Sequence, residues 1–293
     1  MATGIQTNRT SIAPPAEISA EILQKTQEQS AVMQLARQIQ LPGTGAEIPV
    51  ITSDPDAAWV SETAAKPVGN PGLTKKTMTA YKLAVLVPFS NEFQRDLPAL
   101  YDALVERLPG ALAYKFDQTV AGAVAAPGSN FDTLAGCPTV GMGLDAYNAL
   151  VAADASVSEY GGILNGFALA PAGKSILLGA VDGNKRPLFI NNVAEGAIPM
   201  ILGAPTVISK GIYKESEGGN VVGIAGDWTQ ALYGTVEGVK IDYSTDGTII
   251  TGTGENERVI SLFQNNMFAV RAEIEIGFVA DTNCFALLTD AEK

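Results

Sequence analysis

The first helical pattern of the chain lies close to its N-terminus. Residues 16–43 keep apolar positions such as Ile22 and Leu35 at helical spacing on both sides of a polar middle, and Pro42-Gly43 provides a stop. This stripe is thin, and a helix with a thin apolar stripe needs a partner surface to be stable. We therefore predict a helix over this stretch that packs on another part of the fold, after a polar, disordered or extended arm over residues 1–15.

A second and stronger helical pattern fills residues 96–126. Its apolar side chains keep a period of 3.6 residues over about eight turns. Asp96 is placed to cap the helix, and Pro127-Gly128 is placed to end it. Pro109-Gly110 in the middle predicts a kink or a division into two helices. A helix of this length exceeds an ordinary globular core, so it predicts a spine along the molecule.

Between these helices, residues 54–90 read as a long two-stranded excursion. Two β-like runs, AAWVSE and TMTAYKLAVLVPF, flank a tip rich in proline and glycine, and the short run EIPVI at residues 47–51 predicts a further strand. A two-stranded ribbon is marginally stable alone in water. With few apolar residues at its tip, this ribbon predicts contact with another molecule, and so an assembly.

The second half of the chain alternates between helix and strand before it becomes β-rich. Residues 144–156 predict a helix and residues 161–172 a buried strand, whereas residues 174–181 fit either. From residue 227 onwards the pattern is β, ending in a long strand region over residues 263–289. There Arg271, Glu273 and Glu275 alternate with apolar residues, which predicts a sheet with one wet face.

Composition excludes several classes of function. The 293 residues include no histidine, so there is no Ser-His-Asp or Cys-His couple and no histidine ligand for a metal. Cys137 and Cys284 are too few for a four-cysteine zinc site, and their redox state stays open. The net charge is -12, of which residues 131–293 carry -10 from 9 basic and 19 acidic groups. Such a chain does not hold nucleic acid by bulk charge, and neither a membrane span nor a signal peptide is expected.

Two motifs suggest chemistry but have better explanations. The run GMGLDA at residues 141–146 fits the dinucleotide fingerprint, yet it follows a short segment with Pro138 and lacks the acidic residue about 20 positions later. We interpret it as a glycine-rich loop that leads into a helix. Acidic pairs such as Glu215/Glu217 and Glu255/Glu257 fit a solvated face better than a general-acid or cation site. The sequence predicts no enzyme, no cofactor and no metal.

The lysines and tryptophans offer candidates for contacts between chains. Lys66, Lys75 and Lys76 lie on the ribbon, where lysine either protects a strand edge or forms ion pairs with an acidic neighbouring subunit. Trp59 and Trp228 sit in β-like runs, where tryptophan anchors a core or a subunit contact.

The order of these pieces resembles the major capsid protein of tailed bacteriophages, with the HK97-like fold. The resemblance covers residues 47–293 and is carried by IPV, AAWVSE, the ribbon lysines, KLAVLVPFSNEFQRD, the spine helix, DGNKRPLF, LGAPTVIS, GDWTQALYGTVEGVKIDYS and VRAEIEIGFV. It implies an α+β shell subunit. The implied parts are an N-terminal arm with a helix (1–53), an E-loop β-hairpin (54–90), a P-domain (91–126 and 261–276) and an A-domain (127–260 and 277–293).

The resemblance also implies partners and a location. Subunits would form hexamers and pentamers that close into an icosahedral shell around double-stranded DNA, which is enclosed without sequence-specific binding. A portal protein, a separate scaffolding protein and a decoration or cement protein are the other expected partners. The location is the virion, after assembly in the host cytoplasm. The side chains expected to contact neighbouring subunits are Trp59, Glu62, Lys66, Lys75, Lys76, Arg95, Trp228 and Arg271.

Two alternatives accompany this interpretation. An encapsulin-like nanocompartment would share the fold but enclose protein cargo, and a nucleotide-dependent enzyme built on GMGLDA would be a monomer or small oligomer that binds NAD. Some relatives cross-link an E-loop lysine to an asparagine of another subunit. Asn265 and Asn266 are conceivable acceptors here, but we expect no cross-link.

Overall fold

The structure, a computed structural model, describes most of the chain. The described residues are 16–43, 45–53, 59–60, 72–92, 97–182, 184–189, 200–252 and 257–291. The α-helices within them are α1 (Ala16–Gln29), α2 (Ala31–Leu35), α3 (Leu97–Val120), α4 (Ala146–Glu159) and α5 (Pro171–Gly179), with short 3-10 turns η2 (Leu134–Gly136), η3 (Lys210–Ile212), η4 (Trp228–Gln230) and η6 (Thr282–Cys284). None of the described helices is both long and apolar enough to cross a membrane.

The long strand β14 organises the first of two sheets. This sheet contains β1 (Arg37–Gln40), β4 (Tyr81–Ser90), β10 (Ala231–Thr235), β11 (Lys240–Ser244) and β14 (Met267–Ala280). β4 is antiparallel to β14 over ten consecutive residue pairs, from Tyr81↔Ile276 to Ser90↔Met267. β14 alternates as predicted, since Arg271 is exposed while Val270 and Ala272 are buried.

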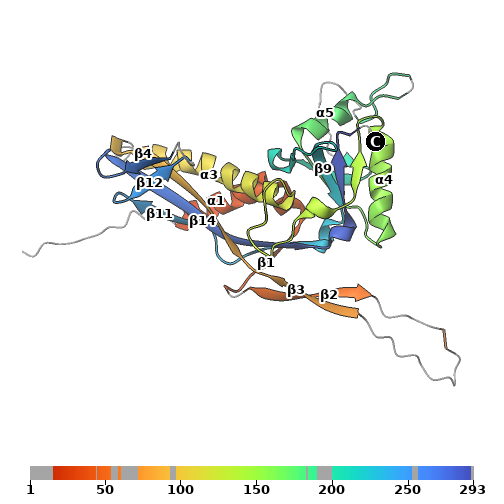
Figure 1. Cartoon of the computed structure of the whole chain (residues 1–293), viewed down its shortest axis with the longest axis horizontal. Coiled ribbons are helices and arrows are strands. Elements are labelled where there is room, and N and C mark those ends of the chain that lie inside the picture. Colours follow the sequence, from red (N-terminus) through yellow and green to blue (C-terminus); the bar gives the residue numbers. More distant parts are fainter. Residues whose placement is uncertain are drawn as a thin grey trace, which may run out of the picture.

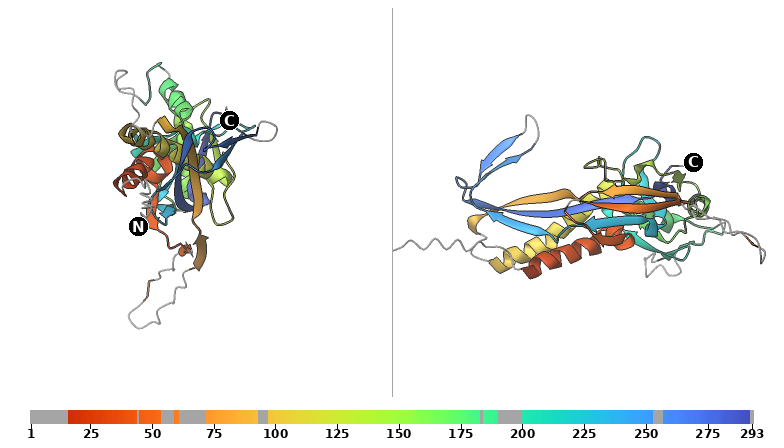
Figure 2. Two further views of the ribbon diagram at one scale, coloured as in Figure 1. Left: turned by 90° about the vertical axis from the view of Figure 1, so that its left-hand side faces the viewer. Right: turned by 90° about the horizontal axis from the view of Figure 1, so that it is seen from below.

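Two helices cover one face of this first sheet. α1 and α3 lie side by side along it (Figure 2), and Ile22, Leu108 and Leu112 pack with Phe268 and Ile274 of β14 in one apolar cluster. An amphipathic helix is stabilised mainly by packing its apolar face in this way. The predicted spine is thus confirmed as a long helix on a sheet.

A second, six-stranded sheet lies at the other end of the molecule (Figure 1). Its order is β5 (Thr139–Gly141), β15 (Phe285–Thr289), β9 (Val221–Gly226), β6 (Gly166–Leu169), β8 (Ala204–Ile208) and β7 (Met200–Ile201). α4 and α5 pack on one face, while the other face meets α2 and the end of α3. α5 resolves the ambiguity over residues 174–181 in favour of a helix.

Two hairpins stand outside these sheets. β12 (Thr248–Thr251) pairs with β13 (Arg258–Ser261), and β2 (Ala46–Ser53) pairs with β3 (Gly72–Met78). We call the β2–β3 pair the ribbon; it projects from the body below the first sheet (Figure 1). The predicted pairing of AAWVSE with TMTAYKLAVLVPF is wrong, because β3 pairs with β2 and β4 takes most of the second run into the first sheet.

Two helix boundaries also differ from the prediction. The first helix ends at Gln29, because Ser30 caps a second short helix, and the chain then becomes the strand β1. The spine helix is one element that runs through Pro109 and ends at Val120 rather than near residue 126. Gly122, with φ of 74°, ends it by a Schellman motif in which Ala123 N–H donates to Gln118 O.

Candidate functional site

The base of the ribbon packs closely against the first sheet at a site where two glycines leave room for it. Gly234 of β10 and Gly277 of β14 face each other in the antiparallel register. A Cβ atom on Gly234 would lie 2.4 Å from Leu41 Cγ, and one on Gly277 would lie 2.8 Å from Thr79 O. Only glycine allows so close an approach. The paired glycines therefore set where the ribbon leaves the body.

Apolar side chains fill the space beside these two glycines. Met78, the last residue of β3, is fully buried and packs with Leu41 and Val279. Ala46 and Ile48 of β2 add partly buried contacts to the same cluster. We call this region, with the Lys76 contacts described next, the ribbon root.

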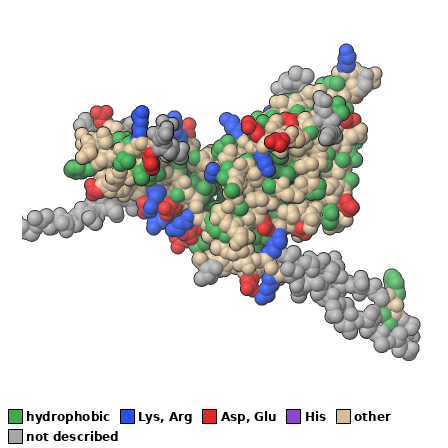
Figure 3. All heavy atoms as spheres, viewed as in Figure 1, with side chains coloured by type: hydrophobic (Ala, Val, Ile, Leu, Met, Phe, Trp, Pro, Cys, Tyr) green, Lys and Arg blue, Asp and Glu red, His purple; other side chains and the backbone are tan. Residues whose placement is uncertain are grey.

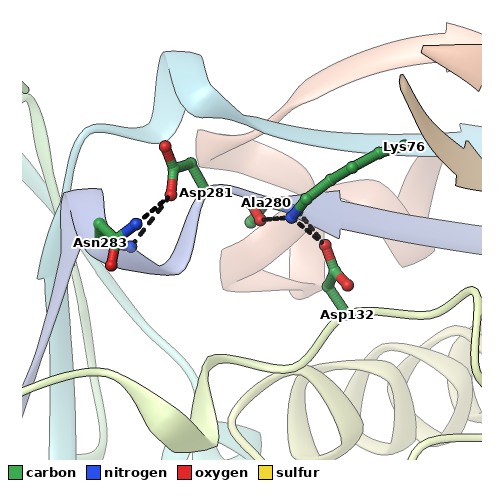
Figure 4. A network of polar contacts seen from close by, with 5 residues as sticks. All are labelled: Lys76, Asp132, Ala280, Asp281 and Asn283. Carbon is green, nitrogen blue, oxygen red and sulfur yellow. Dashed lines mark hydrogen bonds and ion pairs between the residues drawn. The ribbon is translucent and has the colours of Figure 1, made fainter. Parts of the chain in front are cut away.

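A polar contact ties β3 to the corner between the two sheets (Figure 4). Lys76 Nζ lies 2.9 Å from Asp132 Oδ2 and donates to Ala280 O at 2.8 Å. Asp132 Oδ2 also accepts from Ala280 N at 3.2 Å. Beside it, Asp281 Oδ1 accepts from Asn283 N and caps η6, where the chain passes from β14 to β15. Lys76 thus makes an ion pair inside its own subunit, and its expected contact with a neighbour stays a prediction.

Five of the other candidate contact residues fall into three groups. Lys75 Nζ lies 2.7 Å from Glu47 Oε2, and both side chains are more than half exposed, so this pair contributes little to stability. Trp59 is fully exposed, as a subunit contact requires. Glu62, Lys66 and Arg95 lie outside the described residues.

Arg271 is held on the wet face of the first sheet. Its guanidinium lies 2.6 Å from Asp242 Oδ2 and 3.0 Å from Glu273 Oε1. The hydrogen bond to Asp242 and the charge of Glu273 raise the pKa of Arg271. The group is half exposed and satisfied by its own subunit.

Trp228 is a core residue, so its expected contact with a neighbouring subunit is wrong. It is 1% exposed, its Nε1–H donates to Gly166 O at 3.0 Å, and its ring meets the Phe285 ring edge to face. A buried indole normally finds such a partner. A β-like run around a tryptophan does not distinguish core from interface.

Asp117 is a structural centre that the sequence interpretation missed. This carboxylate is buried on α3 and accepts from Ser30 Oγ at 2.6 Å, Ser209 Oγ at 2.6 Å, Ala31 N at 3.0 Å and Val32 N at 3.3 Å. It joins the N-terminal helices, the spine and the start of η3. Burial raises the pKa of Asp117 despite these hydrogen bonds. One sequence signal indicates that Asp117 is buried. It is an acidic residue on the apolar side of the helix, with Ala113 four residues before it and Ala121 four residues after it.

The GMGLDA loop is closed by the chain itself. Met142 N–H donates to Thr289 O at 2.8 Å, and Gly143 N–H donates to Ala291 O at 2.9 Å. These are the loop amides that would otherwise face a phosphate. Asp145 caps α4 by accepting from Asn148 N. The structure therefore supports a loop that leads into a helix.

Metal ligands and thiols are the remaining candidates for chemistry among the described residues. They hold no group of three potential metal ligands of the His, Cys, Asp and Glu types. Cys137 and Cys284 are free and buried, and burial raises the pKa of Cys137 to about 12, which suppresses thiolate chemistry. An apolar cavity of about 150 Å³ between α3 and β4 has Lys82 and Lys115 in its lining but no carboxylate. The ribbon root, the hydrogen bonds of Asp117 and the closed GMGLDA loop instead hold strands and helices in place.

Comparison with known proteins agrees with this structural role. Residues 12–290 match the phage capsid family. The chain is 30% identical to the probable major capsid protein gp17 of Mycobacterium phage D29, over 94% of this chain and 89% of the relative. It is 31% identical to gp17 of Mycobacterium phage L5, over 90% and 85%. A solved structure from Gordonia phage Cozz has a TM-score of 0.70 at 24% identity and covers 90% of this chain and 87% of its own, which shows the fold. This chain therefore belongs to the phage capsid family, as a major capsid protein of the HK97-like fold, a structural component of the virion shell and not an enzyme.

Proposed function

We propose that this capsid protein forms hexamers and pentamers that close into an icosahedral shell around double-stranded DNA. The observation that carries the proposal is the ribbon. Its buried contacts lie at the root, where Met78 and Lys76 meet the body, while β2 and β3 extend away from it (Figure 1). A two-stranded pair without a core of its own is marginal in water. Contact with a neighbouring subunit would give it the missing surface.

The parts of the subunit are assigned to the family's architecture on this basis. The ribbon, β2 with β3, belongs to the E-loop, and α1 belongs to the N-terminal arm. α3 with β4 and β14 forms the P-domain, to which the sheet pairing adds β10 and β11. The six-stranded sheet with α4 and α5 forms the A-domain. Relative to the predicted boundaries, residues 81–90 and 231–244 move into the P-domain because they hydrogen-bond to β14.

Charge supports enclosure of DNA rather than binding to it. The net charge is -12, and acidic residues outnumber basic ones most strongly after residue 130. Such a surface repels a phosphate backbone. The proposal includes a portal protein, a separate scaffolding protein and a decoration or cement protein as partners. Within this proposal, Trp59 and Lys75 are exposed residues expected to contact another subunit.

Electron microscopy of the purified chain tests this function. We expect rings of five and six subunits and closed shells. A homogeneous 30.5 kDa monomer at every concentration would contradict the proposal. Particles recovered from an infected host should contain double-stranded DNA, whereas shells that carry a protein cargo instead would point to a nanocompartment. Boiling in SDS should give one band, and a ladder above it would show that subunits are cross-linked.

A further inference from the structure

A cavity of about 150 Å³ lies where α3 meets the start of β4 and the end of β14. Its floor is apolar, because Phe116, Phe131 and Ile276 in its lining are each at most 5% exposed. Ala125 and Pro127, which follow α3, are exposed and belong to its rim. An apolar cavity of about 150 Å³ in another protein binds benzene. The size of the cavity therefore limits an occupant to one six-membered ring.

Aromatic rings form much of the lining. The Phe131 ring meets the Tyr81 ring edge to face with centroids 6.3 Å apart, and it meets the Phe116 ring in the same way, also at 6.3 Å. Such contacts are favourable because the edge of an aromatic ring is positive and its face is negative. A further aromatic ring in the cavity would extend this cluster. An aromatic occupant is therefore favoured over an aliphatic one of the same size.

The hydroxyl groups of the lining already have partners within the chain. Thr119 Oγ1 donates to Lys115 O at 2.9 Å, and Tyr81 Oη accepts from Asn130 N–H at 3.3 Å. A buried water needs about three polar partners. Since both hydroxyls are engaged, the walls of the cavity favour an apolar group over ordered water.

Two lysines stand at the rim, and they differ in their partners. Lys82 Nζ lies 3.4 Å from Glu275 Oε1, so part of its charge is compensated within the subunit. Lys115 is exposed and forms no ion pair with a residue in the part of the chain that the structure describes. Among the described residues, none with a carboxylate belongs to the lining. The free charge beside the apolar floor is therefore a cation, which favours an anionic group on the occupant.

The surface of the subunit does not favour anions in general. On the face shown in Figure 3, the described Lys and Arg side chains are interspersed with Asp and Glu side chains. The net charge of the whole chain is -12. Such a surface does not retain a polyanion by bulk charge. An anion at Lys115 must therefore also place an apolar part in the cavity.

We propose that this cavity is a binding site for a small aromatic carboxylate with one ring. The ring would lie against Phe116, Phe131 and Tyr81, and the carboxylate would pair with Lys115. Such a ligand would join the last turns of α3 to β4 and to the segment that follows α3. Because the site belongs to one subunit and needs no neighbour, it stands apart from the proposed function.

Titration of the unassembled subunit with benzoate, followed by NMR, tests the site. We expect one molecule per subunit with a dissociation constant of about 1 mM, a value open to a ligand of this size. Acetate carries the same charge without a ring, and 1-naphthoate carries a second ring that the cavity cannot hold. Both should bind at least about tenfold more weakly than benzoate. No saturable binding of benzoate, or equal binding of acetate, would overturn the proposal.

Three substitutions assign the binding to this cavity. Lys115→Met should weaken benzoate binding about tenfold and leave toluene, which has the ring without the charge, within about twofold. Lys240→Met is the matched control, because it removes the charge of an exposed lysine of β11 outside the lining, and it should change neither affinity by more than about twofold. Val124→Phe puts a larger side chain in the lining and should weaken both ligands at least about tenfold.

Each outcome decides for or against the site. Equal weakening of benzoate by Lys115→Met and Lys240→Met would show that net charge alone attracts it, which contradicts a pair with Lys115. Unchanged binding in Lys115→Met and Val124→Phe would place the ligand elsewhere and would overturn the proposal. If circular dichroism shows that Val124→Phe does not fold, the two lysine variants still decide, because both change only exposed side chains.

Discussion

The strands β3 and β4 follow each other in the chain and each forms an antiparallel pair, yet the two pairs differ in what supports them. β4 pairs with β14 over ten residues, and side chains such as Val85 and Phe89 pack into the cluster beneath α1 and α3. β3 pairs with β2 and contributes to the body only through the ribbon root. The same local structure is therefore part of a core in one case and an extension in the other. The body is expected to fold by itself, whereas the ribbon is expected to be completed by another subunit.

The largest expected effect on the body comes from Asp117. Asp117→Ala leaves two buried hydroxyls and two backbone N–H groups without their acceptor, which should lower the free energy of unfolding by about 3 kcal/mol. Urea denaturation of the unassembled subunit measures this. Asp117→Asn keeps an acceptor oxygen and should lose less than half as much. A loss below about 1 kcal/mol in the alanine variant would show that Asp117 does not join these elements.

The ribbon root can be disturbed by adding one methyl group. Gly277→Ala places a Cβ 2.8 Å from Thr79 O and 2.9 Å from Met78 Cγ, so the ribbon must shift, and we expect a loss of about 2 kcal/mol. Gly179→Ala is the control, because a Cβ there meets no atom within 4 Å. Equal stability of the two variants would contradict the close fit of the root.

The pH dependence of stability tests the buried state of Asp117. Its pKa in the folded protein is raised above the ordinary 3.8, so the folded state binds its proton more tightly than the unfolded chain does. The resulting stability is fully present below about pH 4 and is lost as the pH rises through the folded pKa, at about 1.4 kcal/mol for each unit by which that pKa is raised.

Subtracting the free energy of unfolding of the Asp117→Asn variant from that of wild type isolates the contribution of Asp117, because the other carboxyls titrate alike in both proteins. The free energy of unfolding of wild type minus that of the variant should fall as the pH is raised from 4. A difference that increases with pH would mean that Asp117 is a stabilised anion instead.

The smallest expected effects separate the two ribbon lysines. Lys76→Met removes a half-exposed ion pair and a bond to Ala280 O, and it should cost about 1 kcal/mol, less at high salt. Lys75→Met removes an exposed pair and should cost at most about 0.5 kcal/mol in the free subunit. Denaturation curves of both variants provide the comparison. A larger loss for Lys75→Met would reverse the roles assigned to them.

The pattern of the sequence predicted elements that local periodicity specifies, such as the spine helix and the alternating strand β14. It did not predict the break after Gln29, because Ser30 is held by Asp117, 87 residues later. The sequence pattern did not predict that β4 pairs with β14 instead of belonging to the ribbon, since an apolar run can pair either with a ribbon strand or with a strand of the core. It did not predict the ion pair of Lys76 within its own subunit, because the acceptor Asp132 is remote in sequence. Contacts between distant residues decide these features.

The proposed assembly requires that a neighbouring subunit completes the ribbon. Hydrogen exchange of the amides in β2 and β3, compared between free subunits and assembled shells, measures this directly. We expect fast exchange in the free subunit, strong protection in the shell, and unchanged protection in β4 and β14. Equal exchange in the ribbon before and after assembly would show that no neighbouring subunit completes it.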